Sequence, residues 1–248
     1  MDENEFIEEL AKLPFKYALP IALYDTNGVI QPGNATTTLI KYQDQYFCVT
    51  NNHVIEKLLD VNPSQCYCQI GMNRIDIWNA EIIRSKNQDV CLIKVDEEFD
   101  LSFKNIDELK FNVEFYRLTK NYEVQEGDIV SFGGYPGCFR TVENNRQEIC
   151  YGTYSHAGLP LNSLSNLQGS VWLNDNTDKK ALGSLQRDDL TALGGISGAP
   201  VFKWEFSPIA VPVWIGVVVE GDLHRFQSEH SQIIVDFVSE RTISELLS

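Results

Sequence analysis

The chain has 248 residues, of which 43% are apolar, so it is long enough to bury a sizeable hydrophobic core. Its 20 Lys and Arg residues stand against 35 Asp and Glu residues, which gives a formal net charge of -15, and the basic residues form no stripe. Because phosphate binding needs clustered cations, this balance excludes nucleic acid as the main partner.

The N-terminal residues indicate where the chain resides. Met1 to Glu9 are acidic, whereas an export signal is basic and then continuously apolar. The longest apolar stretch, Ile209 to Val219, is interrupted by Pro212 and is shorter than the ~20 residues that a membrane helix needs. We therefore expect a cytoplasmic protein with no membrane partner.

The six cysteines predict free thiols. Four of them lie inside or beside apolar, strand-like runs, and a chain without an export signal keeps its thiols reduced. Cys66-Tyr67-Cys68 lacks the CxxC spacing of a structural zinc site, so we expect no metal and no other cofactor. If this segment is a strand, its two thiols share one face.

Helical periodicity is confined to a few short segments. An apolar face on Phe6, Ile7 and Leu10 predicts a short acidic helix before Pro14 that docks on the core. A second helical turn is expected after His53. Similar spacing is found at Ile106 to Leu109, and a final helix is expected to begin at Ser239 as N-cap and to present Ile243, Leu246 and Leu247 on one face.

Most of the chain alternates short β-branched and aromatic runs with Gly, Asn, Asp and Pro turns. Many short strands at this spacing are typical of an all-β sandwich or barrel. The runs are Thr36 to Tyr42, Tyr46 to Thr50, Arg74 to Trp78, Val90 to Val95, Ile129 to Phe132, Ile149 to Tyr154, Val171 to Leu173 and Trp214 to Val219.

Three segments carry the residue types that nucleophilic catalysis needs. They are Thr50-Asn51-Asn52-His53, Asp89-Val90-Cys91-Leu92-Ile93 and Gly194-Gly195-Ile196-Ser197-Gly198-Ala199-Pro200. A serine hydroxyl is a poor nucleophile at neutral pH unless an imidazole takes its proton and a carboxylate holds that imidazole in the right tautomer. The segments thus predict His53 as base, Asp89 as orienting carboxylate and Ser197 as nucleophile.

Each segment alone has a plainer explanation. A Gly-x-Ser-Gly turn is common, a histidine after two asparagines can simply begin a helix, and an aspartate can open a strand. Ser197 with Asp222 and either His224 or His230 would also give the residue order of an α/β-hydrolase. That fold requires Gly-x-Ser-x-Gly followed by a helix, whereas here Ala199 replaces the second glycine and the next residues favour a strand.

The three segments together resemble the trypsin/chymotrypsin superfamily, and most nearly the HtrA-type trypsin-like peptidase domains of bacteria without their PDZ domain. That branch has a Thr-Asn-x-His-Val pattern, an Asp-Val-Ala-Leu-Ile-Lys-Val-like strand and a Gly-Asp-x-Val…Gly-x-Pro-Gly segment. The matching residues here are Thr50-Asn51-Asn52-His53-Val54, Asp89-Val90-Cys91-Leu92-Ile93-Lys94-Val95, Gly127-Asp128-Ile129-Val130 and Gly134-Tyr135-Pro136-Gly137.

The resemblance covers nearly the whole chain and implies a fold. It predicts one peptidase domain over residues 1–248, built from two six-stranded antiparallel β-barrels with short N- and C-terminal helices. The N-terminal barrel, 14–117, would carry His53 and Asp89. The C-terminal barrel and closing helix, 118–248, would carry Ser197.

The same resemblance implies a serine endopeptidase that hydrolyses protein or peptide substrates through an acyl-enzyme. Gly195 lets the backbone turn so that its N–H and that of Ser197 converge on the developing oxyanion. The substrate backbone would pair with the strand that contains Val219, Glu220 and Gly221.

By the same resemblance Thr191, six residues before the nucleophile, would form the floor of the primary pocket. A neutral floor favours a small-to-medium apolar residue before the scissile bond. The carboxylates of Asp188, Asp189 and Glu220 lie close by in sequence, and if they turned inward they would restore a preference for cations.

Ile196 stands where secreted relatives carry the acid that couples this turn to zymogen cleavage. We expect narrow specificity or control by an activating or inhibiting partner, through Met1 to Leu13, Asn174 to Leu190 or the loop around Cys138 to Glu148. Analogy suggests a bacterial stress or antiviral defence system. The alternative is a catalytically silent trypsin fold that binds peptides or acts as a scaffold.

Overall fold

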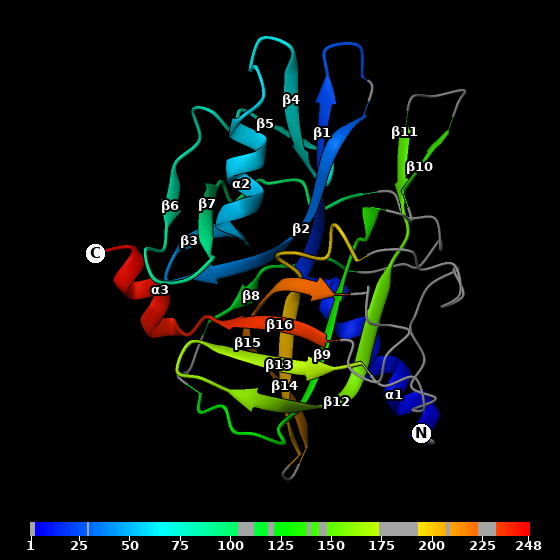
Figure 1. Cartoon of the computed structure of the whole chain (residues 1–248), viewed down its shortest axis with the longest axis vertical. Helices are drawn as coiled ribbons and strands as arrows, with labels where there is room; N and C mark the ends of the chain where they lie inside the picture. The colour runs from blue at the N-terminus through cyan, green and yellow to red at the C-terminus, as the bar shows by residue number, and fades with distance from the viewer. Residues whose placement is uncertain are drawn as a thin grey trace.

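The computed structural model of the chain describes residues 3–28, 30–103, 112–118, 122–137, 140–143, 148–173, 193–206, 209–222 and 232–248. Its strands form two bodies arranged along the long axis of the molecule, a sheet in the upper half of Figure 1 and a barrel in the lower half. A hairpin of β10 (Arg140–Glu143) and β11 (Glu148–Tyr151) rises from the barrel to lie beside the sheet.

The first body is an eight-stranded sheet whose main path runs β5-β4-β1-β2-β3-β7-β6, with β8 paired in parallel to β2. Its inner face is covered by α2 (Asn52–Leu59), which buries Val54, Ile55 and Leu58. The strands are β1 (Ala18–Asp25), β2 (Ile30–Tyr42), β3 (Gln45–Thr50), β4 (Cys66–Ile70), β5 (Asn73–Ile75), β6 (Ile82–Arg84), β7 (Cys91–Val95) and β8 (Tyr116–Arg117).

This body departs from the closed six-stranded barrel expected for the N-terminal half, because the hydrogen-bonded path ends at β5 and β6 instead of joining them. Both end strands have only three residues. The strand expected over Arg74 to Trp78 stops at Ile75, since the chain enters a turn in which the Asn79 N–H donates to the Asp76 carbonyl at 3.2 Å.

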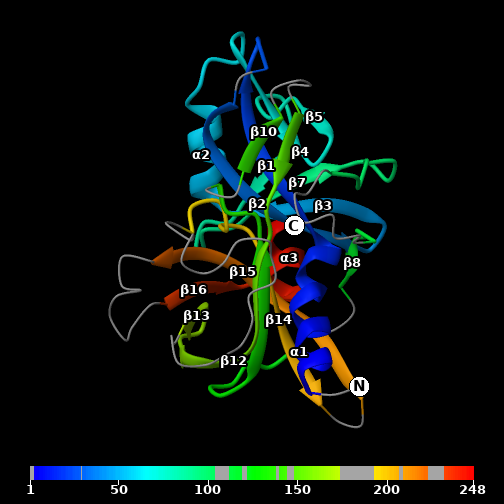
Figure 2. The same ribbon diagram turned by 90° about the vertical axis from the view of Figure 1, so that its right-hand side faces the viewer.

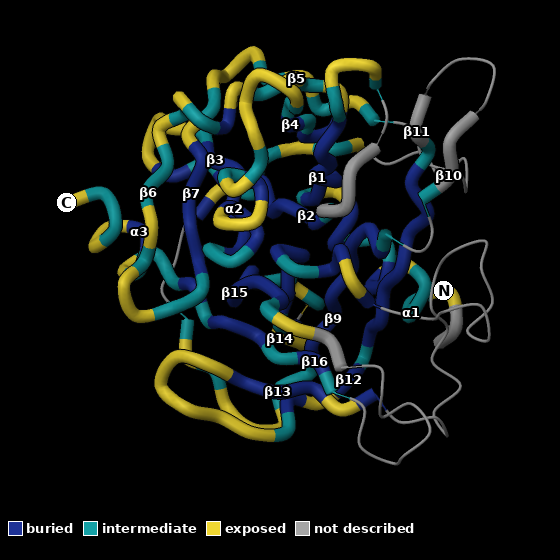
Figure 3. The backbone as a smooth tube through the Cα atoms, turned by 45° about the horizontal axis from the view of Figure 1, so that its top comes forward, coloured by how far each residue is buried: buried dark blue, intermediate teal, exposed yellow. Residues whose placement is uncertain are grey.

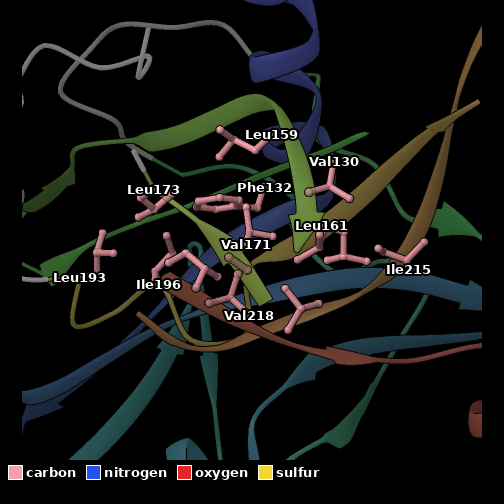
Figure 4. Packing of buried hydrophobic residues seen from close by; sticks show 14 of the residues in the cluster. Val130, Phe132, Leu159, Leu161, Val171, Leu173, Leu193, Ile196, Ile215 and Val218 are labelled. Atoms are coloured by element: carbon pink, nitrogen blue, oxygen red, sulfur yellow. The ribbon is translucent and has the colours of Figure 1, made fainter. Parts of the chain in front are cut away.

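The second body is a closed antiparallel barrel of six strands in the order β12-β13-β16-β15-β14-β9. Apolar residues from all six strands fill its interior, and Figure 4 shows Leu193 and Ile196, which precede β14, pointing into the same core. The strands are β9 (Ile129–Gly134), β12 (Tyr154–Leu164), β13 (Gln168–Trp172), β14 (Pro200–Phe206), β15 (Ala210–Asp222) and β16 (Gln232–Phe237).

The terminal helices pack on apolar residues of the barrel and of the contact between the two bodies. α1 (Glu3–Lys12) packs Leu10 and Ala11 against Ala157 and Trp204 of the barrel, and its backbone lies against β12 and β9. Figure 2 shows the helix on the outside of the barrel. It continues into the short helix η1 (Leu13–Tyr17). The helix expected after Ser239 is α3 (Glu240–Leu246), and a reciprocal capping box between Ser239 and Thr242 begins it.

A shared apolar cluster joins the two bodies. Ile40, Phe47 and Leu92 of the sheet pack in one cluster with Phe202 and Trp214 of the barrel, and all five are fully buried. Figure 3 shows buried backbone running through both bodies, with the longer exposed stretches in the loops between strands. Because the seam is rigid, residues at facing edges of the two bodies are held at fixed separations.

The all-β class and the short terminal helices agree with the sequence-based expectation. Strands of the sheet lie between residues 18 and 117, and those of the barrel between 129 and 237. The domain boundary at 117/118 stays a prediction. No helix among the described residues is long and apolar enough to cross a membrane.

Candidate active site

His53 and Asp89 meet because of strand pairing. His53 lies in the first turn of α2, directly after β3, and Asp89 lies two residues before β7, which pairs with β3 in the register Thr50↔Cys91. Oδ2 of Asp89 is 2.5 Å from Nδ1 of His53, and Oδ1 accepts the backbone N–H of His53 at 2.9 Å. Both oxygens of one carboxylate thus fix one histidine.

The pKa of Asp89 reflects this pairing. Burial alone would raise the pKa of the carboxyl, but hydrogen bonds from the ring and backbone of His53 outweigh burial, so the pKa lies below its ordinary value. Asp89 is therefore an anion at neutral pH. An anion at Nδ1 places the ring proton there and leaves Nε2 as the basic nitrogen.

The two asparagines before His53 hold the loop that carries Asp89. Nδ2 of Asn51, a fully buried side chain, donates to the carbonyl of Asp89 at 2.7 Å. Nδ2 of Asn52 donates to the carbonyls of Ser85 at 3.1 Å and Gln88 at 3.0 Å. The Thr-Asn-Asn-His segment thus supplies the base and also the side-chain amides that hold the loop of Asp89.

A second carboxylate, which the sequence analysis missed, lies behind Asp89. Asp236 of β16 is fully buried, and its Oδ2 accepts the backbone N–H of Asp89 at 2.8 Å. Its Oδ1 accepts Nε2 of Gln168, the cross-strand neighbour on β13, at 2.7 Å. Burial raises the pKa of Asp236, and the nearby charge of Asp89 adds to this. The barrel thereby fixes the loop that orients His53.

Ser197 lies just before β14, and its hydroxyl donates to the carbonyl of Val219 at 3.0 Å. That carbonyl is turned toward Ser197 because β15 has an irregularity between Val218 and Glu220 in its pairing with β16. Ser197 and His53 line one cavity of about 390 Å³. Among the described residues no hydrogen bond joins these two side chains.

The turn before Ser197 has a defined type. The Ile196 N–H donates to the Leu193 carbonyl at 3.0 Å, and Gly195, the third residue of the turn, has φ of +104°. Gly194, the second residue, is not among the residues with positive φ, and a hydrogen-bonded β-turn with positive φ at its third position alone is type II. A side chain at Gly195 would also overlap Asn34. Both the positive φ and the lack of space therefore require glycine at this position.

The peptide bond between Gly194 and Gly195 is fixed through its carbonyl oxygen, which has two donors. That oxygen accepts the Gly137 N–H at 2.7 Å and Nδ2 of Asn34, a residue of the cavity wall, at 3.3 Å. In a trans peptide the N–H points away from the carbonyl. Within the described ranges neither the Gly195 N–H nor the Ser197 N–H has a hydrogen-bond partner.

Strand β2 braces the same turn. Thr36 donates its hydroxyl to the Gly195 carbonyl at 2.8 Å and its backbone N–H to the Ser197 carbonyl at 2.9 Å. Thr38 donates to the Gly198 carbonyl at 2.9 Å. Both threonines are fully buried, as is Ile196 on the core side. The turn is therefore ordered by packing and hydrogen bonds.

The predicted substrate pocket is described only in part. Thr191, together with Asp188 and Asp189, lies outside the described residues, as do His224 and His230 of the alternative triad. On β15, Val219 is half-buried, Glu220 is exposed, and Gly221 pairs with Ile233 of β16. The roles of Thr191, Val219, Glu220 and Gly221 stay predictions.

The described residues include no group of three or more His, Cys, Asp or Glu side chains arranged to hold a metal ion. The described cysteines, at 48, 66, 68, 91 and 150, are free thiols. Cys66 and Cys68 lie on β4 and belong to one apolar cluster, and burial raises the pKa of the Cys68 thiol to about 12.

No protein-family model matches the chain, and no curated protein matches it. Among solved structures it is similar to a cysteine-to-alanine mutant of tobacco etch virus protease, with a TM-score of 0.51 and 10% sequence identity. The match covers 95% of this chain and 79% of that chain. At this identity the likeness shows the fold, so the chain is a trypsin-like double β-barrel protein.

Proposed function

We propose that the chain is a serine endopeptidase of the trypsin type, with His53, Asp89 and Ser197 as its triad. The observation that carries the proposal is convergence on one cavity. The His53–Asp89 pair, the Ser197 hydroxyl and two unpaired N–H groups come from both bodies of the fold. A base, a nucleophile and an oxyanion site are the parts that acyl transfer needs.

The chemistry begins with a rotation of Ser197. Turning about χ1 moves its hydroxyl from the Val219 carbonyl toward Nε2 of His53, and such hydrogen bonds commonly tighten only when substrate binds. His53 then takes the hydroxyl proton as Oγ attacks the substrate carbonyl carbon.

The oxygen of that carbonyl becomes an anion, and the N–H groups of Gly195 and Ser197 stabilise it. Each donor of this kind lowers the barrier by about 3 kcal/mol. His53 next gives its proton to the leaving amine, which breaks the peptide bond and leaves an acyl group on Ser197. Water, deprotonated by His53, attacks the acyl carbon and restores the free hydroxyl.

The braced turn supports an enzyme whose oxyanion donors are in place at rest. Control by a partner would then act on access to the cavity, and not on formation of the turn. We extend the proposal by analogy with HtrA-type peptidases to a narrow-specificity, cytoplasmic enzyme of a bacterial stress or antiviral defence system. The competing function is a silent trypsin fold that binds peptides.

A peptide library separates the two. The wild-type chain should cleave a subset of peptides, most readily after small-to-medium apolar residues, and Ser197→Ala should lower the rate by about 10³-fold or more. Arg or Lys before the cut would overturn the pocket assignment and leave the triad intact. Equal binding of peptides by both proteins, without cleavage by either, would establish the silent fold.

A further inference from the structure

The cavity beside Ser197 extends away from β15 and beneath α2. Its apolar floor is formed by Ile21 of β1 and by Val54 and Leu58 of α2, each at most 7% exposed. Polar groups stand at its wall and rim, the amide of Asn34 and the ammonium of Lys57. An apolar floor with a few polar groups is the usual composition of a binding pocket.

The position of this cavity identifies which part of a substrate it receives. None of its lining residues comes from β15, and the Val219 carbonyl approaches Ser197 from that strand. In the proposed reaction His53 protonates the leaving amine, so the residues after the scissile bond must lie on the His53 side. This inference therefore rests on the proposed function.

Lys57 is an unpaired cation in an acidic chain. It is exposed on α2, and no carboxylate of a described residue lies within 4 Å of its Nζ. Its neighbour Glu56 is directed to Arg84, with Oε1 3.5 Å from Nη1. Asp60, at the end of the helix, is exposed as well. With a formal net charge of -15, a free cation at the rim of the cavity is a local exception.

We propose that this cavity selects the residues that follow the scissile bond: an apolar side chain on the Ile21, Val54 and Leu58 floor, then a carboxylate at Lys57. The carboxylate is that of an Asp or Glu side chain or of a free C-terminus. The remaining negative charge of the chain repels acidic peptides elsewhere, so Lys57 fixes their register as well as attracting them.

Acyl-transfer partitioning tests this independently of the pocket before the cut. Once an apolar amino-acid p-nitrophenyl ester has acylated the enzyme, an added amine competes with water for the acyl group, and the yield of transfer product reports binding on the leaving-group side. The acceptors are Leu-Glu amide, Leu-Gln amide, Leu-Lys amide, and dileucine with a free or an amidated C-terminus.

Leu-Glu amide should be used about two- to fivefold better than Leu-Gln amide, the range expected for a solvent-exposed ion pair, and Leu-Lys amide should be used least. The preference should fall as salt is added. Lys57→Gln should remove it and Lys57→Glu should invert it. Lys94→Gln is the matched control, because Lys94 is exposed on β7 beside Glu81 and does not line the cavity.

The outcomes separate the two claims. Preference for the Glu side chain, or only for the free terminus of dileucine, supports the proposal and identifies the source of the carboxylate. Equal use of all acceptors by an enzyme that is acylated overturns it and leaves the proposed function standing. Absence of acylation by p-nitrophenyl esters of apolar and of basic amino acids alike overturns the proposed function, and this inference with it.

Discussion

Asp236 accepts the backbone N–H of Asp89 at 2.8 Å, so a buried carboxylate of the barrel positions the acid that orients His53 on the sheet. The contact joins the two bodies at the point where their relative placement decides the geometry of the site. Gln88, next to Asp89, adds a second tie through Nε2 to the Phe237 carbonyl at 2.7 Å.

Removal of this contact should lower kcat more than it changes KM. In Asp236→Ala the N–H of Asp89 and the amide of Gln168 both lose an acceptor. The loss costs about 1–3 kcal/mol of stability at the part-buried Asp89 N–H and little at Gln168, which is exposed to water. Steady-state kinetics on the best library peptide, with urea unfolding alongside, measures both effects. Gln168→Ala is the control, because it removes only the outer hydrogen bond of Asp236 and should retain most of kcat.

The two aspartates should have opposite effects on stability as pH changes. The pKa of Asp89 is lowered from 3.8, so its contribution is complete above that pH and is lost as pH falls through its folded value. The pKa of Asp236 is raised from 3.8, so folding weakens as pH rises from 3.8 through its folded value.

Urea unfolding across acidic pH checks these signs. The stability difference between wild type and Asp89→Asn should grow with rising pH, and that between wild type and Asp236→Asn should shrink. If both differences moved in the same direction, the opposite pKa shifts assigned to the two carboxyls would be wrong.

Thr36→Val tests the brace on the oxyanion turn with almost no change in shape. The variant removes the hydroxyl that donates to the Gly195 carbonyl and accepts the Tyr135 N–H at 3.0 Å. We expect kcat to fall by about tenfold or more, toward the loss seen when an oxyanion donor is removed, with KM little changed. Thr37→Val is the control, because Thr37 donates to Val49 within the sheet. Equal losses in both variants would indicate general destabilisation.

Gly195→Ala should abolish activity more completely than backbone strain alone explains. At φ of +104° an alanine costs about 1–3 kcal/mol, and its Cβ would also overlap Asn34 and displace the Gly194 carbonyl. Gly127→Ala has a similar φ of +87° with no atom within 4 Å of the new Cβ, so it incurs only the strain. Activity assays at matched folded fraction should show near-wild-type turnover for Gly127→Ala. Comparable turnover in both variants would remove the turn from the mechanism.

Local patterns in the sequence were sufficient to select the candidate triad residues, of which His53 pairs with Asp89 and lines one cavity with Ser197. The helix after His53, the strand after Asp89 and the strand after Ser197 each follow from a few adjacent residues. The Ser239 cap is of the same kind, because a capping box is complete within four residues.

Features that depend on distant pairing could not be obtained in this way. β1 was not anticipated because seven of its eight residues are buried, so it lacks the alternation of a one-sided strand and it contains Pro20. Asp236, Thr36 and Thr38 have unremarkable neighbours in sequence, and their roles arise only when the barrel meets the sheet.

The most direct test of the central claim is mass-spectrometric mapping of the site that a fluorophosphonate labels. The account predicts one adduct per chain on Ser197, labelling slowed by about 10³-fold or more in His53→Ala, and none in Ser197→Ala. An unlabelled wild-type chain that is fully folded, or an adduct on another residue that persists in Ser197→Ala, would contradict it.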